Sequence, residues 1–436
     1  MADSDTKTRA WPDSLWAAVT PPGPELAPLT KDIETDYAVV GAGFTGLSTA
    51  LHLAVECCDV TVIEAVSPGW GASGRNNGQV IPTLTRPEPD DIEARHGAAG
   101  ERFVGVIRDS ADYLFSLVRA HDLQAEAEQN GWIQPVHSPG RMKIAERRVE
   151  QWSKRGAPVE LLSRDEVVAL TGSQQWHGGF WNRTGGHINP LALARELARA
   201  VIENGGAIYD NTPAQSVSRQ GDRWIIKTPK GEVRARHLML ATNAYTGEFS
   251  PTLEPDVARE VVPILSWQMA TRPLGDNLRS MIIPGRHAVS DTHGDLHFMR
   301  YDVRHRLVTG GALIIAADGA TRLRSRIGAR LQRIFPDIAD THFDYIWNGY
   351  VGMTTDFMPR FHQIGPNGFA WVGCNGRGVG LSVRLGLEFA RALQGTPLDQ
   401  LGLPLTEPKP LPLHGAVRML APLRLIQFRW KDSREI

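Results

Sequence analysis

Short apolar runs and amphipathic segments alternate along most of this chain of 436 residues. An apolar run at 37–40 leads into a glycine-rich turn and then into a helical pattern over 47–56. A second apolar run at 59–64 ends in an acidic residue. Strand, helix and strand at this spacing predict a β-α-β unit with parallel strands.

The same alternation continues toward the C-terminus. A helix is predicted over 101–121, where apolar residues recur at steps of three and four. Asn189 and Pro190 suit the N-cap and first position of another helix. The remaining pattern predicts strands at 207–209, 224–228, 237–241 and 369–374, mostly strands over 257–347, and helices at 321–335 and 379–393. The strand–helix elements occur at the beginning, middle and end of the chain, so the domain that they form is predicted to be discontinuous.

The composition is that of an ordinary globular protein, with 42% apolar and 22% charged residues. The formal net charge of −1 gives no overall field to attract nucleic acid or an anionic membrane. The cysteines at 57, 58 and 374 show no metal-ligand spacing and fit a reducing compartment. No signal sequence and no membrane span of about 18 apolar residues is apparent, so a cytoplasmic location is expected.

The turn after the first strand has the G-x-G-x-x-G spacing of Gly41, Gly43 and Gly46. These glycines allow a tight turn, close approach of a pyrophosphate, and close packing of helix on strand. Glu64 ends the second strand, where an acid would bind ribose hydroxyls and repel a 2′-phosphate. The arrangement predicts binding of FAD or NAD but not NADP; the alternative is a tight strand–helix turn without a ligand.

Three further glycine-rich or small-residue segments occur at 69–79, 241–245 and 373–380. Together with the first turn, they resemble the D-amino-acid-oxidase-like FAD oxidoreductases. This family includes oxidases of glycine, sarcosine and γ-glutamylputrescine, and the resemblance is closest to the last and extends over nearly the whole chain. It implies an α/β fold, with a Rossmann-like, discontinuous FAD-binding domain and a substrate domain whose antiparallel sheet covers the flavin.

The resemblance also implies a division of the chain and a set of residues that contact FAD. The expected segments are an N-terminal arm at 1–34, an FAD-binding domain at 35–87, 160–247 and 348–395, a substrate domain at 88–159 and 248–347, and a C-terminal tail at 396–436. The expected FAD contacts are Gly41, Ala42, Gly43, Phe44, Thr45, Gly46, Glu64, Ala65, Gly71, Ala72, Ser73, Gly74, Arg75, Asn76, Asn77, Gly78, Gln79, Ala214, Ala241, Thr242, Asn375, Gly376, Arg377, Gly378, Val379, Gly380 and Leu381.

Differences from the family pattern bear on the attachment of FAD and on the electron acceptor. Covalent members carry a cysteine where this chain has Gly349, so noncovalent FAD is predicted, although Cys374 lies beside a glycine-rich loop. The lysine that promotes reaction with oxygen falls at Gly380, and a carboxylate-binding arginine falls at Ile81. Oxygen and a quinone therefore both stay open as acceptors.

The substrate side can be predicted only in outline. Trp70, Trp267 and Trp347 are candidates for a dry pocket that keeps an amine neutral, although each also suits core packing. Arg300 and Tyr301 could bind a substrate carboxylate, or Arg300 could form a structural salt bridge. The histidines and aspartates at 291–297 predict a hairpin turn rather than a metal site.

The function expected from the resemblance is oxidation of the C–N bond of a small-molecule amine or amino acid. Hydride transfer to flavin N5 gives an imine, which water hydrolyses. A γ-glutamylated or otherwise acylated polyamine is the first substrate expected, and a cyclic or N-alkyl amino acid is the alternative. An NADH-dependent flavin reductase or hydroxylase, and a flavin-bearing protein without turnover, are the other classes. The basic amphipathic tail is expected to pack as a terminal helix, with lipid contact as the alternative.

Overall fold

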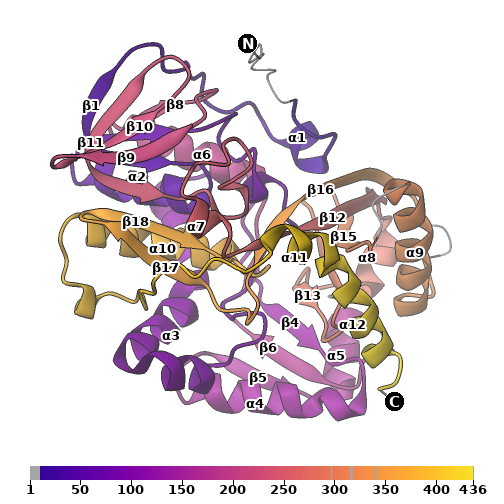
Figure 1. Ribbon diagram of the computed structural model, residues 1–436. Helices are drawn as coiled ribbons and strands as arrows, with labels where there is room; N and C mark the ends of the chain where they lie inside the picture. The colour runs from indigo at the N-terminus through magenta and orange to yellow at the C-terminus, as the bar shows by residue number, and fades with distance from the viewer. Residues whose placement is uncertain (1–9, 296, 315–317, 339–340, 436) are drawn as a thin grey trace.

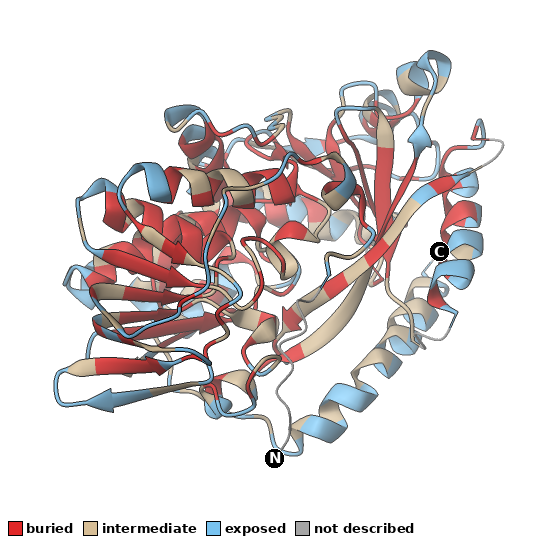
Figure 2. Cartoon of the chain, turned by 90° about the horizontal axis from the view of Figure 1, so that it is seen from above, coloured by how far each residue is buried: buried red, intermediate tan, exposed pale blue. Residues whose placement is uncertain are grey.

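The computed structural model describes residues 10–295, 297–314, 318–338 and 341–435. Two eight-stranded sheets form the framework, one built mainly around parallel strands and one almost entirely antiparallel (Figure 1). The strands of both sheets are largely buried, whereas the helices that end at the C-terminus are exposed or intermediate (Figure 2). The predicted α/β fold with an antiparallel second sheet is confirmed.

The first sheet has the strand order β17-β18-β11-β1-β2-β8, and β10 and β9 extend from β11. Its central parallel strands are β1 (Ile33–Val40), β2 (Val60–Ile63), β8 (Ala207–Tyr209), β11 (Glu232–Leu240) and β18 (Gly368–Val372). Its antiparallel strands are β9 (Ser216–Gln220), β10 (Arg223–Lys227) and β17 (Arg360–Gly365). Because parallel strands end at the same edge, the turns after β1, β2 and β11 lie together.

Four long helices support this sheet: α2 (Phe44–Val55), α3 (Pro89–Ala120), α6 (Pro190–Glu203) and α10 (Val379–Leu393). Helix α2 packs between α6 and α10. The approach of α10 is close, because a Cβ at Gly386 would lie 2.3 Å from Ser48 Oγ. The predicted cap of α6 is confirmed, since the Asn189 side chain accepts a hydrogen bond from the Ala192 N–H at 3.1 Å.

The second sheet has the order β16-β12-β15-β14-β13-β4-β6-β5, and only β13 and β4 pair in parallel. Its strands are β4 (Trp132–Pro135), β5 (Val159–Leu162), β6 (Gly179–Asn182), β12 (Val262–Pro273), β13 (Ala288–Ser290), β14 (Phe298–Tyr301), β15 (Arg306–Gly311) and β16 (Phe343–Met353). A small third sheet joins β3 (Gln79–Val80) to β7 (Gly186–His187).

The other α-helices surround this framework. They are α1 (Leu15–Val19), α4 (Met142–Ser153), α5 (Arg164–Thr171), α7 (Pro255–Ala258), α8 (Asp276–Met281), α9 (Gly319–Ile334), α11 (His414–Leu420) and α12 (Arg424–Asp432). Among the described residues, no helix is both long and apolar enough to cross a bilayer.

The arrangement of the strands and helices differs from the predicted division of the chain in two places. Strands β5 and β6 belong to the second sheet, although 160–247 was assigned to the FAD-binding domain. Helix α3 (Pro89–Ala120) packs against α10, although 88–159 was assigned to the substrate domain. Both differences arise from contacts between segments far apart in sequence, which local periodicity does not report.

Candidate functional site

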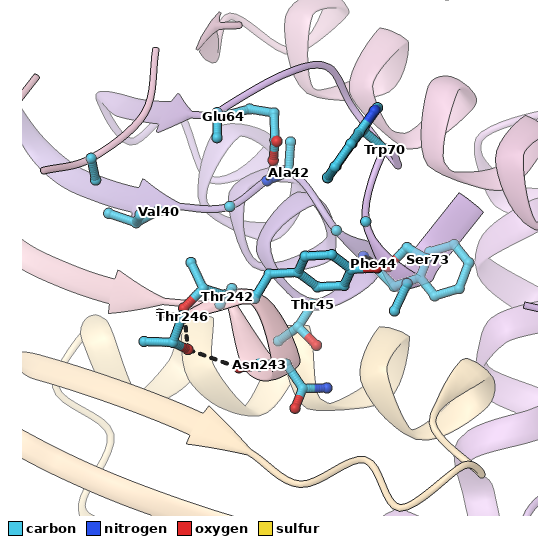
Figure 3. A pocket seen from close by; sticks show the side chains of 18 of the residues that line it. Val40, Ala42, Phe44, Thr45, Glu64, Trp70, Ser73, Thr242, Asn243 and Thr246 are labelled. Carbon is cyan, nitrogen blue, oxygen red and sulfur yellow. Dashed lines mark hydrogen bonds between the residues drawn. The ribbon is translucent and has the colours of Figure 1, made fainter. Parts of the chain in front are cut away.

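A first cavity lies where β1, β2 and β11 end (Figure 3). Thirteen of the predicted FAD contacts line it: Gly41, Ala42, Gly43, Phe44, Thr45, Glu64, Ala65, Gly71, Ala72, Ser73, Ala214, Ala241 and Thr242. The elements that carry them are separated by up to two hundred residues, and the parallel sheet brings them to one edge. The edge and the residues fit the expected position of a dinucleotide.

The glycine turn is built for close approach. Gly41 has a φ of +103°, and a Cβ at Gly46 would lie 2.0 Å from the Gly41 carbonyl oxygen. The Phe44 N–H donates to Ser73 Oγ at 3.0 Å, which ties the start of α2 to the loop after β2. The other N–H groups in the first turn of α2 have no acceptor within the helix, so they can bind a phosphate.

Both carboxylate oxygens of Glu64 accept hydrogen bonds from backbone, one of them from the glycine turn. The donors are the N–H groups of Ala42 at 2.7 Å and Val66 at 3.1 Å. Figure 3 shows its side chain directed toward Ala42. Burial raises the pKa of Glu64, and these N–H groups oppose that shift. A carboxylate oxygen can accept more than one hydrogen bond, so the contact with ribose hydroxyls stays a prediction.

An aromatic group borders the same cavity. Trp70 makes edge-to-face contacts with Tyr245 at 6.1 Å and with Phe249 at 5.8 Å between ring centroids. Trp70 therefore lines the first cavity and not the second, and its predicted place beside the substrate stays a prediction. Sequence reasoning missed Tyr245 and Phe249 as lining residues, although Tyr245 ends the small-residue segment at 241–245 that it had singled out.

The segment at 73–79, which is predicted to run beside the flavin ring, is called the ring-side loop. A second cavity, of about 1420 Å³, lies at its C-terminal end. Seven predicted FAD contacts line it: Asn76, Asn77, Gln79, Asn375, Gly376, Arg377 and Val379. Ile264, Ser266 and Gln268 of β12 line it as well, together with the C-terminal helices. The volume exceeds the roughly 300–1,000 Å³ of an ordinary small-molecule pocket. It has room for the flavin end of the cofactor and a substrate.

The remaining predicted FAD contacts line neither cavity; they are Gly46, Gly74, Arg75, Gly78, Gly378, Gly380 and Leu381. Several of them are needed for packing. A Cβ at Gly74 would lie 2.4 Å from the Gly69 oxygen, and a Cβ at Gly78 would lie 2.1 Å from the Ile188 oxygen. The family motif therefore contains residues that shape the loops as well as residues that face the cavities.

Three successive carbonyl groups of the ring-side loop are held from outside by buried side chains. Each of the three hydrogen bonds is 2.8 Å long. Trp347 Nε1 donates to the Arg75 oxygen and Trp16 Nε1 donates to the Asn76 oxygen. Arg300 Nε donates to the Asn77 oxygen. The indole rings of Trp16 and Trp347 also meet edge to face at 6.0 Å. Trp347 and Arg300 thus position the loop, and neither lines the second cavity.

The predicted substrate contacts of Arg300 and Tyr301 are contradicted by their surroundings. Arg300 also donates to the carbonyl oxygens of Tyr301 and Ile188, both at 2.7 Å, and burial lowers its pKa to about 10. The Tyr301 hydroxyl donates to the Ile282 oxygen at 2.9 Å. Both side chains are buried and satisfied by backbone, which their sequence context on a strand could not indicate.

Trp267 is also placed away from the second cavity. Side chains on a strand alternate between its faces, and Ser266 and Gln268 face the cavity. Trp267 points to the other face, where it packs near Gly319 at the start of α9. Of the three tryptophans predicted for the substrate side, Trp70 lines the first cavity, Trp347 holds the ring-side loop and Trp267 packs against the core of the second sheet.

Arg377 borders the second cavity but is held by the protein. It donates to Thr83 Oγ1 at 2.6 Å and to the Leu84 oxygen at 2.9 Å, and its guanidinium lies 4.7 Å from the Trp132 ring centroid. Burial lowers its pKa. Helix α10 begins at Val379 as predicted. Stabilisation of negative charge on a reduced flavin by this helix start stays a prediction.

Arg86 is the cavity residue that sequence reasoning missed. Its guanidinium lies between two phenyl rings, 4.4 Å from the centroid of Phe357 and 4.7 Å from that of Phe428. Within the described residues it forms no ion pair or hydrogen bond. Burial lowers the pKa of Arg86, and repulsion from the nearby Arg424 and Arg141 lowers it further. A cation in these surroundings favours a bound anion, and no sequence motif marks it.

The loop that carries Arg86 is joined by a hydrogen bond to the loop at 375–379, which is predicted to lie beside the flavin and is called the flavin-side loop. Thr85 Oγ1 donates to the Asn375 carbonyl oxygen at 2.5 Å. The Asn375 side-chain oxygen in turn accepts from the Thr354 N–H at 2.8 Å, close to Phe357 in the chain. These bonds fix Arg86 and one of its aromatic neighbours relative to the loop at 375–379.

Three histidine rings are stacked beside the second cavity. The His293 ring centroid lies 3.9 Å from that of His137 and 4.0 Å from that of His297, and Asp291 accepts from His293 Nδ1 at 2.7 Å. The predicted hairpin is confirmed, since β13 and β14 pair antiparallel around this turn. Asp291, His293 and His297 present ligand atoms within 4.8 Å of one another, and the expectation of no metal stays a prediction.

This stack should make stability depend on pH. Burial, together with the weaker effect of His293, lowers the pKa of His137 to about 4. Burial also lowers the pKa of His297 to about 4. Unfolded histidines bind protons near pH 6.5, so the free energy of unfolding should fall as pH drops from about 6.5 to 4, by up to about 1.4 kcal/mol per unit for each ring. Denaturant unfolding at several pH values measures this slope, which His137→Asn should reduce. An unchanged slope in that variant would refute the assignment.

Comparison with known proteins agrees with this geometry. The sequence profile of the family described as "DAO: FAD dependent oxidoreductase" matches residues 36–392. The chain is 30% identical over 369 residues to gamma-glutamylputrescine oxidoreductase of Escherichia coli (strain K12), covering 84% of this chain and 85% of that protein. It is 30% identical over 430 residues to "Probable oxidoreductase OrdL" of Rhizobium meliloti (strain 1021), covering 97% of both. Glycine oxidase from Geobacillus kaustophilus superposes with a TM-score of 0.70 at 18% identity, over 84% of this chain and 95% of that one, which shows a shared fold.

Proposed function

Because the chain belongs to the DAO family of FAD-dependent oxidoreductases, we propose that it oxidises the C–N bond of an alkyl amine that also bears a carboxylate, of the γ-glutamylputrescine type. Membership of the family gives FAD as the cofactor and an amine or amino acid as the class of substrate. Bound flavin supplies the acceptor for a hydride from the carbon that carries the nitrogen. The electron acceptor that follows is open between oxygen and a quinone.

The observation that carries the substrate proposal is the position of Arg86. It lines the same cavity as the loops at 76–79 and 375–379, which are predicted to flank the flavin ring. Arg424 lines this cavity too, and neither arginine forms an ion pair with a described carboxylate. Asp432 acts on Arg86 only through space and also lies close to Arg141. Two guanidinium groups without an ion pair therefore support a substrate with an anionic end.

The other part of the cavity suits the nitrogen that is oxidised. Apolar side chains lie beside the flavin-side loops, among them Ile81, Ile264 and Val351. An alkyl amine resembles lysine, with a pKa of about 10.4, so about one molecule in a thousand is neutral at pH 7. Desolvation by apolar walls lowers such a pKa, and three units correspond to about 4 kcal/mol. Apolar walls and guanidinium groups in one cavity support an amine that is held dry and a carboxylate that is held by arginine.

An anaerobic panel of amines tests the proposal. FAD-loaded protein is mixed with γ-glutamylputrescine, putrescine, pipecolate, N-methylamino acids and NADH, and loss of the flavin's visible absorbance is followed. Rapid bleaching by γ-glutamylputrescine and slow bleaching by putrescine is the expected result. Bleaching by pipecolate or N-methylamino acids alone, or by NADH and no amine, would reject the proposal. Repeating the reaction with the amine that bleaches the flavin, in the presence of oxygen or of a quinone, identifies the electron acceptor.

FAD is expected to be held without a covalent bond. Gly349 stands where covalent relatives have a cysteine, and a Cβ there would lie 3.1 Å from Arg75 Cβ, so a larger side chain would crowd the ring-side loop. Cys374 lines neither cavity. Acid precipitation of the yellow protein should therefore leave the flavin in the supernatant. A yellow pellet after washing would contradict this and would make Cys374→Ser the next variant to test.

A further inference from the structure

The C-terminal helices expose a row of large apolar side chains. The exposed fractions are 74% for Met419, 48% for Leu423, 52% for Ile426 and 52% for Trp430. These four residues are spaced by four, three and four positions. The backbone is helical or nearly so from α11 through Leu423 into α12, so the four side chains share one face. In Figure 2 the helices that end at the C-terminus carry only the colours for exposed and intermediate residues.

The opposite face of the same segment is fixed to the body of the protein. Phe428 packs on Arg86, and Arg429 Nε donates to Asp295 at 3.0 Å. The Gly294 N–H donates to Asp432 at 2.9 Å. The segment is therefore an ordered amphipathic element whose apolar row faces outward, rather than a loose tail. A row of this size on a surface is typical of an interaction site.

The charges along the exposed side are mostly positive. Arg418, Arg424, Lys431 and Arg434 are exposed, and none forms an ion pair with a carboxylate in the part of the chain that the structure describes. Arg424, Lys431 and Arg434 also border the second cavity, so they lie between that cavity and the apolar row. Arg434 lies over the Trp430 ring, 4.0 Å from its centroid. The nearby acids Asp432 and Glu435 share Arg141 as a partner, which offsets part of their negative charge. The net charge of the whole chain, −1, hides this local excess.

We propose that this outer face, defined by Met419, Leu423, Ile426 and Trp430 with their flanking cations, binds the surface of an anionic membrane. Apolar residues flanked by arginine and lysine are the composition of helices that lie in the lipid interface. Such a helix lies along the surface, so a membrane-spanning segment is not needed. The inner side of the segment lines the second cavity, so lipid binding would hold that cavity next to the membrane.

A second copy of the chain fits this face less well than lipid does. A two-fold interface places the same patch against itself, so the flanking cations of both copies would come together. The like charges would oppose association, whereas acidic lipid headgroups would neutralise them. Charge therefore favours lipid over self-association.

Vesicle sedimentation tests the proposal with the full-length, FAD-loaded protein. Vesicles of phosphatidylglycerol and phosphatidylcholine should bind the protein, vesicles of phosphatidylcholine alone should bind it weakly, and high salt should release part of it. The double variant Leu423→Glu/Ile426→Glu should lower the partition coefficient by about tenfold. Val303→Glu is the matched control, because Val303 is 46% exposed but lies elsewhere, and it should bind as the unmodified protein does.

Three outcomes would overturn the proposal. The unmodified protein could fail to bind anionic vesicles at low salt, or the double variant could bind as well as the control. The protein could instead form a dimer that the double variant converts to a monomer, with no binding to vesicles, which would assign the face to a second copy. Flavin content and thermal unfolding of each variant show whether a loss of binding reflects a loss of folding. Catalytic activity plays no part in the readout, so this test is independent of the substrate assignment.

Discussion

Replacing Arg86 with alanine should raise the KM for a carboxylate-bearing amine between about tenfold and a hundredfold, with little change in kcat. A hydrogen bond to a charged group contributes about 1.5–3 kcal/mol, which corresponds to this range. Arg86 lies between Phe357 and Phe428 without an acidic partner among the described residues, so a substrate carboxylate would become its partner. Steady-state kinetics with a substrate and its carboxamide analogue measures the effect.

Two controls make this result specific. The carboxamide should lose little on the substitution, because it offers no charge to the guanidinium. Arg147→Ala removes another arginine that lines the same cavity, and its effect on KM should be small. An equal rise in KM for the carboxylate and the carboxamide would mean that Arg86 acts only through packing. An equal rise in KM in the Arg86→Ala and Arg147→Ala variants would mean that Arg86 acts only through the overall positive charge of the cavity.

Gly46→Ala should abolish the yellow holoenzyme. The new Cβ would lie 2.0 Å from the Gly41 carbonyl oxygen, which belongs to backbone that cannot move without opening the turn between β1 and α2. We expect a loss of more than about 3 kcal/mol of stability, with insoluble or flavin-free protein. Flavin content and thermal unfolding measure both consequences.

Two other glycines serve as matched comparisons. Gly105 lies inside α3 with nothing within 4 Å of an added Cβ, so Gly105→Ala should stabilise the protein by about 0.5–1 kcal/mol. At Gly43 the added Cβ would meet only Ser73 Oγ, at 3.0 Å. Gly43→Ala should therefore fold but bind FAD more weakly. Normal flavin content in Gly46→Ala would show that the turn is more adaptable than its geometry indicates.

The dinucleotide side could be predicted from the sequence because its signals are local. The spacing of Gly41, Gly43 and Gly46 fixes a turn, and the residues on either side fix a strand and a helix. The Asn189 cap and the start of α10 at Val379 also lie within a few residues of their signals. The family resemblance then identified FAD, which spacing alone did not separate from NAD.

The substrate side could not be predicted because its contacts join distant segments. Arg300 and Trp347 looked available for a ligand, yet their polar groups hold the backbone of the loop at 75–77. Arg86 has no motif, and its aromatic neighbours come from residues 357 and 428. Only the tertiary structure shows which arginine is satisfied by backbone and which one faces a cavity.

The parallel pairing of β18 with β11 has a consequence for how the protein is made. β18 and α10 lie near the C-terminus, while the glycine turn lies near the N-terminus. During synthesis the ribosome releases the turn long before the strand and helix that complete its surroundings. Flavin loading should therefore follow translation, and chains that stop before residue 372 should depend on chaperones and be degraded.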